Sequence, residues 1–467
     1  MKQPNSAICR LGKLLLVLVF PALALAADGF ERRWHWFLAD IGHSVALTGD
    51  GGYLVGGETQ LSSTQYGIVL ARTDSSGDTT WVRHMVGTDQ SGGYACRLLD
   101  GGYAVLGTRN NGAIFVRKFS AAGDSVWTYV SSWSGPVSAV IATNDSGCAI
   151  AGRMPDTIAD FGYIKLRPDG TEEWARYYDD PIVWTTWARN AAQTRDGGYI
   201  ICGDGHDYSG SYLRLVRINS SGDTLWTRLY VGLIAPYLAA VCEMQDGGFL
   251  AAGYTFDTLT SLNRLYMMRT NSTGDTLWTR TIEPTGVDAQ AWAMSGTRDG
   301  GHIIAGSVDW FDSARVWLVK VDSDGDTVWT RTLGGPGRET GADVEQTVDG
   351  GYIVAGTSDS AGGSVLLIKT DSLGRVGIAE GRLPARERIA FSVAPNPASG
   401  IVRIRYTSPG NREATLRMYD VFGRQVYSSF GLRASSFRLD LRSLPAGVYL
   451  LRLDSDLGSA TRKLVIE

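Results

Sequence analysis

Aromatic and acidic side chains gather in short segments that lie between expected β-strands. Tyr177-Tyr178-Asp179-Asp180 precedes Trp184 and Trp187, and later segments are His206-Asp207-Tyr208 and Asp309-Trp310-Phe311-Asp312. Aromatic rings stack on the apolar faces of sugars, and carboxylates accept hydrogen bonds from sugar hydroxyls. The side chains predicted to bind a ligand are therefore Tyr178, Asp180, Trp184, Trp187, Asp207, Tyr208, Asp309 and Trp310. The alternative is that these rings pack within their own loops, because irregular loops usually need local packing.

Two of these carboxylates suggest acid–base chemistry. Asp207 and Asp309 could cleave a glycoside if their carboxyl groups lay about 5–10 Å apart. However, a chain with 48 acidic residues contains many such pairs by chance. The five histidines occupy unrelated positions, and we find no Ser-His-Asp order or phosphate-binding glycine loop. No catalytic residue is predicted, and the chain is expected to bind a ligand rather than to transform it.

One segment resembles a metal-binding loop. Asp322-Ser323-Asp324-Gly325-Asp326 places oxygen ligands at alternate positions, as the start of a calcium loop does. The corresponding segment elsewhere is Asn219-Ser220-Ser221-Gly222-Asp223, and no bidentate glutamate follows either of them. A repeated turn is the better interpretation. Neither a metal site nor a cofactor is predicted.

Four cysteines follow the first apolar segment: Cys96, Cys148, Cys202 and Cys242. Their spacing matches no zinc or redox motif. Cys96 and Cys242 fall on expected first strands of a repeat, and Cys148 and Cys202 on second strands. Disulfides 96–148 and 202–242 are conceivable in an oxidising compartment. Buried free thiols are favoured, because disulfide geometry is strict.

A repeat of about fifty residues must position all these groups. An Asp-Gly-Gly-aromatic turn, or a close variant of it, begins at residues 50, 100, 145, 196, 246, 299 and 349. A Gly-Asp-Thr-x-Trp element or a close variant follows six of these turns, and its tryptophans are Trp81, Trp127, Trp174, Trp226, Trp278 and Trp329. Repeats of this length that contain only strand and turn signals indicate a β-propeller. The fold class is therefore all-β, with seven four-stranded antiparallel blades followed by a small Ig-like β-sandwich.

The fifth repeat shows how one blade is expected to form. Strands are predicted at 239–244, 249–253, 264–269 and 277–280, and the turn at Asp246-Gly247 is predicted to be type I′. The tryptophan on the outermost strand can pack against the adjacent sheet and bury its indole. This Gly-x-x-x-Trp strand resembles that of the tryptophan-docking propellers, a group that includes quinoprotein dehydrogenases. The resemblance covers only the repeat chemistry and brings no cofactor residues.

The seventh repeat lacks its tryptophan after Arg375-Val376-Gly377. The segment from Phe30 to Trp36 is predicted to supply the missing outer strand, which closes the ring and removes two exposed sheet edges. Either Phe30 or Trp34 would fill the docking slot. In such a ring, fourth-to-first and second-to-third connections share one face, so the predicted ligand residues should meet at one mouth of the central channel.

The ends and the charge of the chain indicate its destination. Lys2, Arg10 and Lys13 precede or begin an apolar stretch that ends in Ala24-Leu25-Ala26, the pattern of a secretory signal peptide. No other stretch is expected to cross a membrane. The net charge is −4, and the repeat region is more acidic than the basic part after residue 385. An acidic repeat region argues against nucleic acid as a partner.

The last eighty residues or so have a different pattern. Strands are predicted at 401–407, 414–419, 436–441, 447–453 and 462–466. The motifs Pro395-Asn396-Pro397-Ala398, Tyr419-Asp420-Val421-Phe422-Gly423-Arg424, Leu444-Pro445-Ala446-Gly447-Val448-Tyr449 and Lys463-Leu464-Val465 follow in order. Together they resemble the C-terminal sorting domain of the type IX secretion system. The resemblance implies export across the outer membrane of a Bacteroidetes-type envelope, with this machinery and a cell-surface sortase as partners. It also implies attachment to surface lipopolysaccharide or release. The alternative is an ordinary Ig-like accessory domain.

The predicted organisation is a signal peptide (1–26), a propeller (27–377), a linker (378–388) and a sorting domain (389–467). The function that follows is binding of a glycan or a protein at the cell surface or outside the cell. A carbohydrate-active enzyme with its site at the propeller mouth is the first alternative. A structural component of the surface layer is the second.

Overall fold

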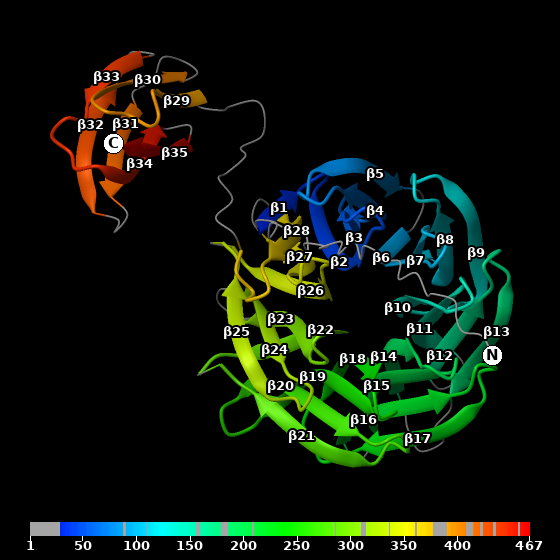
Figure 1. Ribbon diagram of the computed structural model, residues 1–467. Coiled ribbons are helices and arrows are strands. Elements are labelled where there is room, and N and C mark those ends of the chain that lie inside the picture. Colours follow the sequence, from blue (N-terminus) through cyan, green and yellow to red (C-terminus); the bar gives the residue numbers. More distant parts are fainter. Residues whose placement is uncertain are drawn as a thin grey trace, which may run out of the picture.

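The computed structural model contains β-strands and no α-helix in the part of the chain that it describes (Figure 1). It describes residues 29–376 and 390–467, except for 87–89, 110, 156–158, 179–184, 208–209, 285, 310–313, 336, 360–361, 408–413, 421–423, 433–435 and 456–457. The predicted signal peptide and the whole of the predicted linker lie outside these residues. No helix in the described ranges is long and apolar enough to span a membrane.

Residues 30–370 form groups of four antiparallel strands around a common centre (Figure 1). The inner strands are β2 (Ala39–Leu47), β6 (Gln90–Arg97), β10 (Val137–Ala142), β14 (Thr185–Gln193), β18 (Tyr237–Glu243), β22 (Ala289–Gly296) and β26 (Glu339–Gln346). The second strands are β3 (Tyr53–Gln60), β7 (Tyr103–Arg109), β11 (Cys148–Pro155), β15 (Tyr199–Asp207), β19 (Phe249–Asp257), β23 (His302–Val308) and β27 (Tyr352–Ser358). The third strands are β4 (Tyr66–Thr73), β8 (Ala113–Phe119), β12 (Ala159–Leu166), β16 (Gly210–Ile218), β20 (Leu262–Thr270), β24 (Arg315–Val321) and β28 (Ser364–Thr370). The outer strands are β5 (Thr79–Met85), β9 (Ser125–Ser134), β13 (Glu172–Tyr178), β17 (Thr224–Tyr230), β21 (Thr276–Ile282), β25 (Thr327–Leu333) and β1 (Phe30–Trp34). A single parallel contact between β12 and β14 joins two of the groups into one eight-stranded sheet.

The N-terminal strand completes the last group, as predicted. β1 pairs antiparallel with β28, and Phe30 lies opposite Lys369. In the other groups the docking tryptophan has the same register: Trp226, for example, lies opposite Arg217. Phe30 therefore occupies the docking position, and Trp34 lies four residues farther along the same strand. The structure thus decides between the two candidates in favour of Phe30.

Docking takes the same form around the ring. Each docked ring lies over a glycine in the turn that follows the third strand of the next group. A Cβ added to Gly170 would come within 2.5 Å of the Trp127 ring, and one added to Gly77 within 2.4 Å of the Phe30 ring. These glycines have positive φ, +85° and +77°, so they provide both the turn and the space for the ring. The indole of Trp127 also donates a hydrogen bond to the Pro168 carbonyl at 3.0 Å.

The Asp-Gly-Gly turn is not the predicted type I′ turn. Positive φ occurs at Gly247 (+83°) but not at Asp246, and the hydrogen bond between Met244 N and Gly248 O is 2.8 Å. This is a three-residue hairpin loop with one left-handed residue. The aspartate has another role, since its carboxylate pairs with a lysine or arginine of the third strand that is buried in every group but the first. The pairs are Asp50–Arg72, Asp100–Lys118, Asp145–Lys165, Asp196–Arg217, Asp246–Arg269, Asp299–Lys320 and Asp349–Lys369.

The C-terminal part forms two sheets around one apolar core. One sheet contains β29 (Ala390–Ala394), β30 (Ile401–Thr407) and β33 (Ser436–Asp440). The other contains β31 (Ala414–Asp420), β32 (Gln425–Leu432), β34 (Gly447–Ser455) and β35 (Gly458–Ile466). Val402, Leu416, Leu439 and Leu451 are among the core side chains from both sheets. Strands β29 and β32 were not predicted from the sequence.

The predicted sorting motifs contact one another within this part. Asn396 donates to the Lys463 carbonyl at 2.8 Å and accepts from Val465 N at 2.8 Å, which ties the first motif to the last strand. The Tyr449 hydroxyl donates to the Pro445 carbonyl at 2.9 Å, within the Leu-Pro-Ala-Gly motif. Asp420 accepts from Arg424 N at 2.9 Å. Gly423 lies outside the described residues.

Candidate functional site

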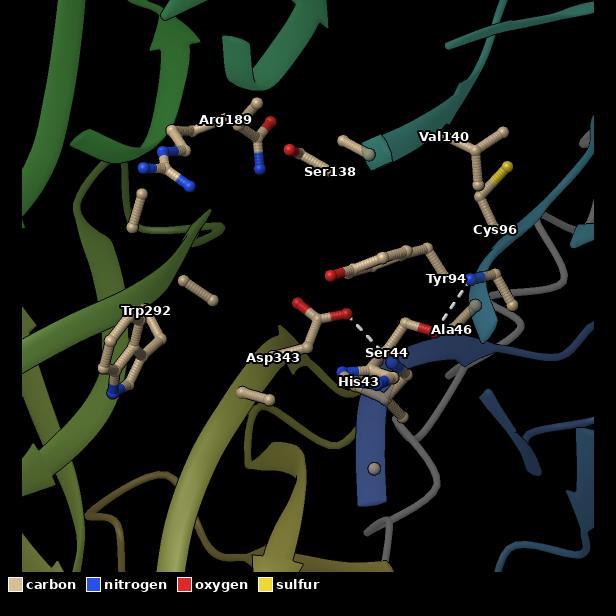
Figure 2. Close-up of a pocket in the computed structure, with 18 of the residues that line it drawn as sticks. His43, Ser44, Ala46, Tyr94, Cys96, Ser138, Val140, Arg189, Trp292 and Asp343 are labelled. Carbon is tan, nitrogen blue, oxygen red and sulfur yellow. Dashed lines mark hydrogen bonds between the residues drawn. The ribbon is translucent and has the colours of Figure 1, made fainter. Parts of the chain in front are cut away.

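A β-bulge occurs at the same place on every inner strand. In each group the pairing of the inner strand with the second strand skips one residue. The skipped residues are His43, Gly93, Ser138, Arg189, Ala239, Trp292 and Ala342. A bulge changes the direction of a side chain. Six of these seven residues line a central cavity of about 970 Å³, part of which Figure 2 shows.

One wall of this cavity is a stack of rings and guanidinium groups. The rings of Tyr254 and Tyr237 are parallel, with their centroids 4.9 Å apart. The Arg189 guanidinium lies 4.6 Å from the Tyr237 centroid and 4.6 Å from the Trp187 centroid, and Arg153 lies 5.1 Å from Trp187. These are cation–π distances. The ring faces of Trp187 and Tyr237 therefore contact neighbouring arginines, and the stack is a preformed wall.

Trp292 extends this wall. Its ring meets Tyr237 and Tyr254 edge to face, at centroid distances of 5.6 Å and 5.5 Å. Its indole N–H donates to the Ser307 hydroxyl at 3.2 Å. Trp292 is a bulge residue and lines the cavity, so its ring is a candidate for contact with a ligand (Figure 2).

The charge of Arg189 is neutralised within the wall. Its Nε donates to Asp204 Oδ1 at 2.8 Å and its Nη2 donates to Asp204 Oδ2 at 3.1 Å. Such a two-point pair holds the guanidinium in one orientation. Burial raises the pKa of Asp204, and the pair with Arg189 offsets part of that rise. The positive charge in this wall is thus matched by a negative one.

Two carboxylates on β26 line the same cavity. Asp343 Oδ2 accepts a hydrogen bond from Val45 N at 2.9 Å, and Glu345 Oε2 accepts from Leu47 N at 3.2 Å. Both donors belong to β2, so these bonds join the last group of strands to the first. Burial raises the pKa of Asp343 to about 6, and burial together with the charge of Asp343 raises the pKa of Glu345 to about 7. Perturbed carboxylates in a cavity are typical of functional sites, although structural networks also produce them.

His43 and Tyr94 contribute a further pair of rings. Their centroids are 5.1 Å apart, with the planes inclined by 30°. Burial lowers the pKa of His43 to about 4, so its imidazole is neutral at physiological pH. Burial raises the pKa of Tyr94, and the charge of Arg189 opposes this rise. The cavity therefore contains neutral donors and acceptors beside its charged groups.

Of the residues predicted to bind a ligand, the structure places Trp187 in the cavity wall. Asp309 is half-buried at φ +60°, and its N–H donates to the Asp288 carbonyl at 2.9 Å. Asp180, Trp184, Tyr208 and Trp310 lie outside the described residues, as does the side chain of Asp207.

Tyr178, which was predicted to bind a ligand, does not face the cavity. Its side chain is buried, and its hydroxyl donates to the Gly222 carbonyl at 3.0 Å. Tyr178 follows Trp174 by four residues on one strand, and alternate residues of a strand face the same side. It therefore points into the junction with the next group, as Tyr230 does after Trp226. Tyr177 faces the other way, is exposed, and lies with its ring 6.2 Å from that of Trp133.

Most of the cavity residues were not predicted from the sequence: Tyr94, Arg189, Tyr237, Trp292, Asp343 and Glu345. One signal was present in the repeat. At the bulge position four repeats have Gly, Ser or Ala, whereas the other three have His43, Arg189 and Trp292. The fold does not require a large side chain at this position, so the large ones in these three repeats indicate another role.

The remaining sequence predictions concern cysteines and metals. Cys96, Cys148, Cys202 and Cys242 are all free, which agrees with the favoured interpretation. Asp322 Oδ1 accepts hydrogen bonds from the backbone N–H groups of Asp324 (3.0 Å) and Asp326 (2.8 Å), so the calcium-like segment is a turn. In the described ranges, no three His, Cys, Asp or Glu side chains are grouped as metal ligands would be.

Comparisons with known proteins are informative mainly for the C-terminal part. Residues 392–467 match the family model described as a secretion system C-terminal sorting domain. No curated protein matches the chain. Among solved structures, an ulvan lyase of a polysaccharide lyase family has a TM-score of 0.50 at 11% identity, covering 74% of this chain and 97% of its own.

Two further solved structures have TM-scores of 0.45. The first is a lectin from Burkholderia pseudomallei (12% identity, covering 73% of this chain and 98% of its own). The second is the β-propeller domain of a protease from Pyrococcus furiosus (9%, covering 74% and 100%). Identities this low speak only to the fold. The four-stranded antiparallel groups around a common centre are those of a β-propeller, and the C-terminal part matches a sorting domain, which implies export by the type IX secretion system.

Proposed function

We propose that this protein is a secreted propeller that is displayed on, or released from, the cell surface and binds a glycan in its central cavity. The cavity of about 970 Å³ is the single observation that carries this proposal. It combines an aromatic ring at Trp292 with hydroxyl, amide and carboxylate groups at Ser138, Asn190 and Asp343. Sugars need this combination, because they present apolar faces and many hydroxyl groups.

The finer architecture belongs to the same proposal. The four-stranded groups are blades of a seven-bladed propeller of the tryptophan-docking type, in which Phe30 replaces the seventh tryptophan. The two C-terminal sheets form an Ig-like sandwich. A full set of blades closed by an N-terminal strand leaves the cavity as a channel through the ring. Its walls come from every inner strand, so a ligand would contact all blades.

The sorting domain supports the proposed location. Its match to residues 392–467 supports export through the type IX machinery after a signal peptide at 1–26 has directed the chain across the inner membrane. We propose that a cell-surface sortase then processes this domain and that the propeller is attached to the surface or released. Either end point places the cavity in contact with extracellular glycans.

A second candidate is a carbohydrate-active enzyme. The raised pKa values of Asp343 (about 6) and Glu345 (about 7) favour it, because a general acid must keep its proton near neutral pH. Both carboxylates, however, accept hydrogen bonds from the backbone of β2, which gives each of them a structural task. Binding is therefore the first proposal.

A glycan array and thermal-shift screen on the full chain tests the proposal. We expect at least one glycan to bind and to raise the melting temperature. The Trp292→Ala variant should lose that binding, while Tyr66→Ala, which removes an exposed aromatic outside the cavity, should keep it. Incubation of the bound glycan with the protein then separates binder from enzyme by product formation. A folded protein that binds no glycan would instead favour a protein partner or a structural role in the surface layer.

A further inference from the structure

The charges around the cavity are not balanced in the same way on the two walls. Arg189 is matched by Asp204 through two hydrogen bonds. Asp343 accepts hydrogen bonds only from backbone groups, Val45 N at 2.9 Å and Val344 N at 2.8 Å. Among the described residues it forms no ion pair with a lysine, arginine or histidine. A ligand would therefore find a compensated cation on one wall and an uncompensated carboxylate on the other (Figure 2).

The neighbouring carboxylate differs from Asp343 in this respect. Burial and the charge of Asp343 raise the pKa of Glu345, while the hydrogen bond from Leu47 and the charge of Arg97 oppose this rise. No cation has a corresponding effect on the pKa of Asp343, which burial raises to about 6. With this pKa the carboxylate is mostly ionised at pH 6.5. A partly buried carboxylate without a counter-charge is costly, and a ligand that supplies one recovers part of that cost.

The surroundings of Asp343 suit a protonated amine. Asp343 follows the bulge residue Ala342, whose methyl group leaves the cavity open beside it. An ammonium group donates strong charge-assisted hydrogen bonds to a carboxylate. Trp292 and Tyr94 line the same cavity, and aromatic faces also attract cations. An anionic ligand would gain little at Arg189, because Asp204 already occupies that guanidinium.

We infer that the cavity selects glycans that carry free amines, such as units of the glucosamine type, over neutral and acidic glycans, with Asp343 as the acceptor of the ammonium group. This inference rests on the proposed glycan-binding function and names the class of ligand. A sugar fits better than a lysine-bearing peptide, because Ser138 and Asn190 offer further polar groups to a ligand rich in hydroxyls.

Calorimetric titration of the full chain at pH 6.5, where most of the glucosamine amines carry a proton, tests the inference. The probes are glucosamine oligomers and their N-acetylated counterparts of the same length. We expect the free amines to bind about tenfold more tightly or better, since a hydrogen bond to a charged group contributes about 1.5–3 kcal/mol. Asp343→Asn should reduce this preference to about one, and Asp124→Asn, at an exposed turn aspartate, should leave it unchanged.

Salt provides a second measurement that needs no variant. Binding of the amine to the wild-type chain should weaken as ionic strength rises, whereas binding of the acetylated oligomer should change little. Equal affinity for the two oligomers would overturn the amine inference and leave the glycan proposal standing. If neutral glycans of the array bind and neither oligomer does, the amine inference is likewise overturned and the glycan proposal still stands. Tighter binding of a lysine-bearing peptide, lost in Asp343→Asn, would overturn the choice of a glycan.

Discussion

Replacing Phe30 with alanine should open the ring at its closure. Phe30 is 5% exposed and contacts the core that β2 and β27 share with β1. A buried phenylalanine hides about 150–250 Å² of surface, which at about 25 cal/mol per Å² amounts to roughly 4–6 kcal/mol as an upper estimate. Alanine keeps part of that contact, so the expected loss in unfolding free energy is about 3–5 kcal/mol. Loss of this size would release β1 from β28.

Trp34 is the internal comparison. It lies on the same strand and face, but it is only half-buried and stacks on Trp36 at 6.1 Å. Trp34→Ala should therefore cost roughly half as much as Phe30→Ala. Phe30→Trp inserts the residue found in the other six slots and should change stability by less than about 1.5 kcal/mol.

Urea unfolding of the full chain, followed by tryptophan fluorescence, measures these differences. Limited proteolysis adds a direct readout, since a released β1 should be cleaved early in Phe30→Ala. A loss below about 1 kcal/mol for Phe30→Ala, or a larger loss for Trp34→Ala, would refute the assignment of the slot to Phe30. Either result would also refute the idea that the circle of strand groups is closed by a docked aromatic side chain, as its other junctions are.

Three further predictions concern turns and carboxylates. Ser146 occupies the left-handed position (φ +67°) that glycine holds in other repeats. Ser146→Gly should therefore raise the unfolding free energy by up to about 1 kcal/mol, and Gly247→Ser should lower it by a similar amount. Urea unfolding measures both changes. The hydrogen bond from Thr48 lowers the pKa of Asp50 to about 2. The contribution of the ionised Asp50 carboxylate to stability should therefore persist above pH 4 and vanish as the pH falls toward 2. This pH dependence should be absent in Asp50→Asn. Burial raises the pKa of Glu345 to about 7, so stability should fall as pH rises from about 4.5 to 7, and Glu345→Gln should gain more relative to wild type at pH 8 than at pH 4.5.

Most of the fold could be predicted from the repeated residues. The predicted strands of the fifth repeat, 239–244, 249–253, 264–269 and 277–280, correspond to β18, β19, β20 and β21. This agreement arises because turn residues and buried strands have strong local signatures. The turn type was predicted wrongly, because Asp246 is needed as the partner of Arg269 and not as a left-handed residue.

The site could be predicted only in part, for two physical reasons. Tyr178 was placed on a loop and predicted to bind a ligand, yet it belongs to a strand whose alternate side chains face the next group. Pairing between distant residues is also invisible in sequence: Arg189 meets Tyr237, and Asp343 meets Val45, across different groups of strands. Among the predicted ligand residues that the structure describes, only Trp187 lies in the cavity wall.

The repeat and the site place opposite demands on the inner strands. A bulge at one register turns one residue per group toward the centre, and this geometry needs no particular side chain, since Gly93, Ala239 and Ala342 accept it as well as Arg189 does. The fold therefore turns the bulge residues toward the centre whatever their side chains are. Side chains there are free to vary for ligand contact while docked rings and turn ion pairs keep the groups together. For this reason a change at Trp292 should alter binding with little effect on closure, and a change at Phe30 should do the reverse.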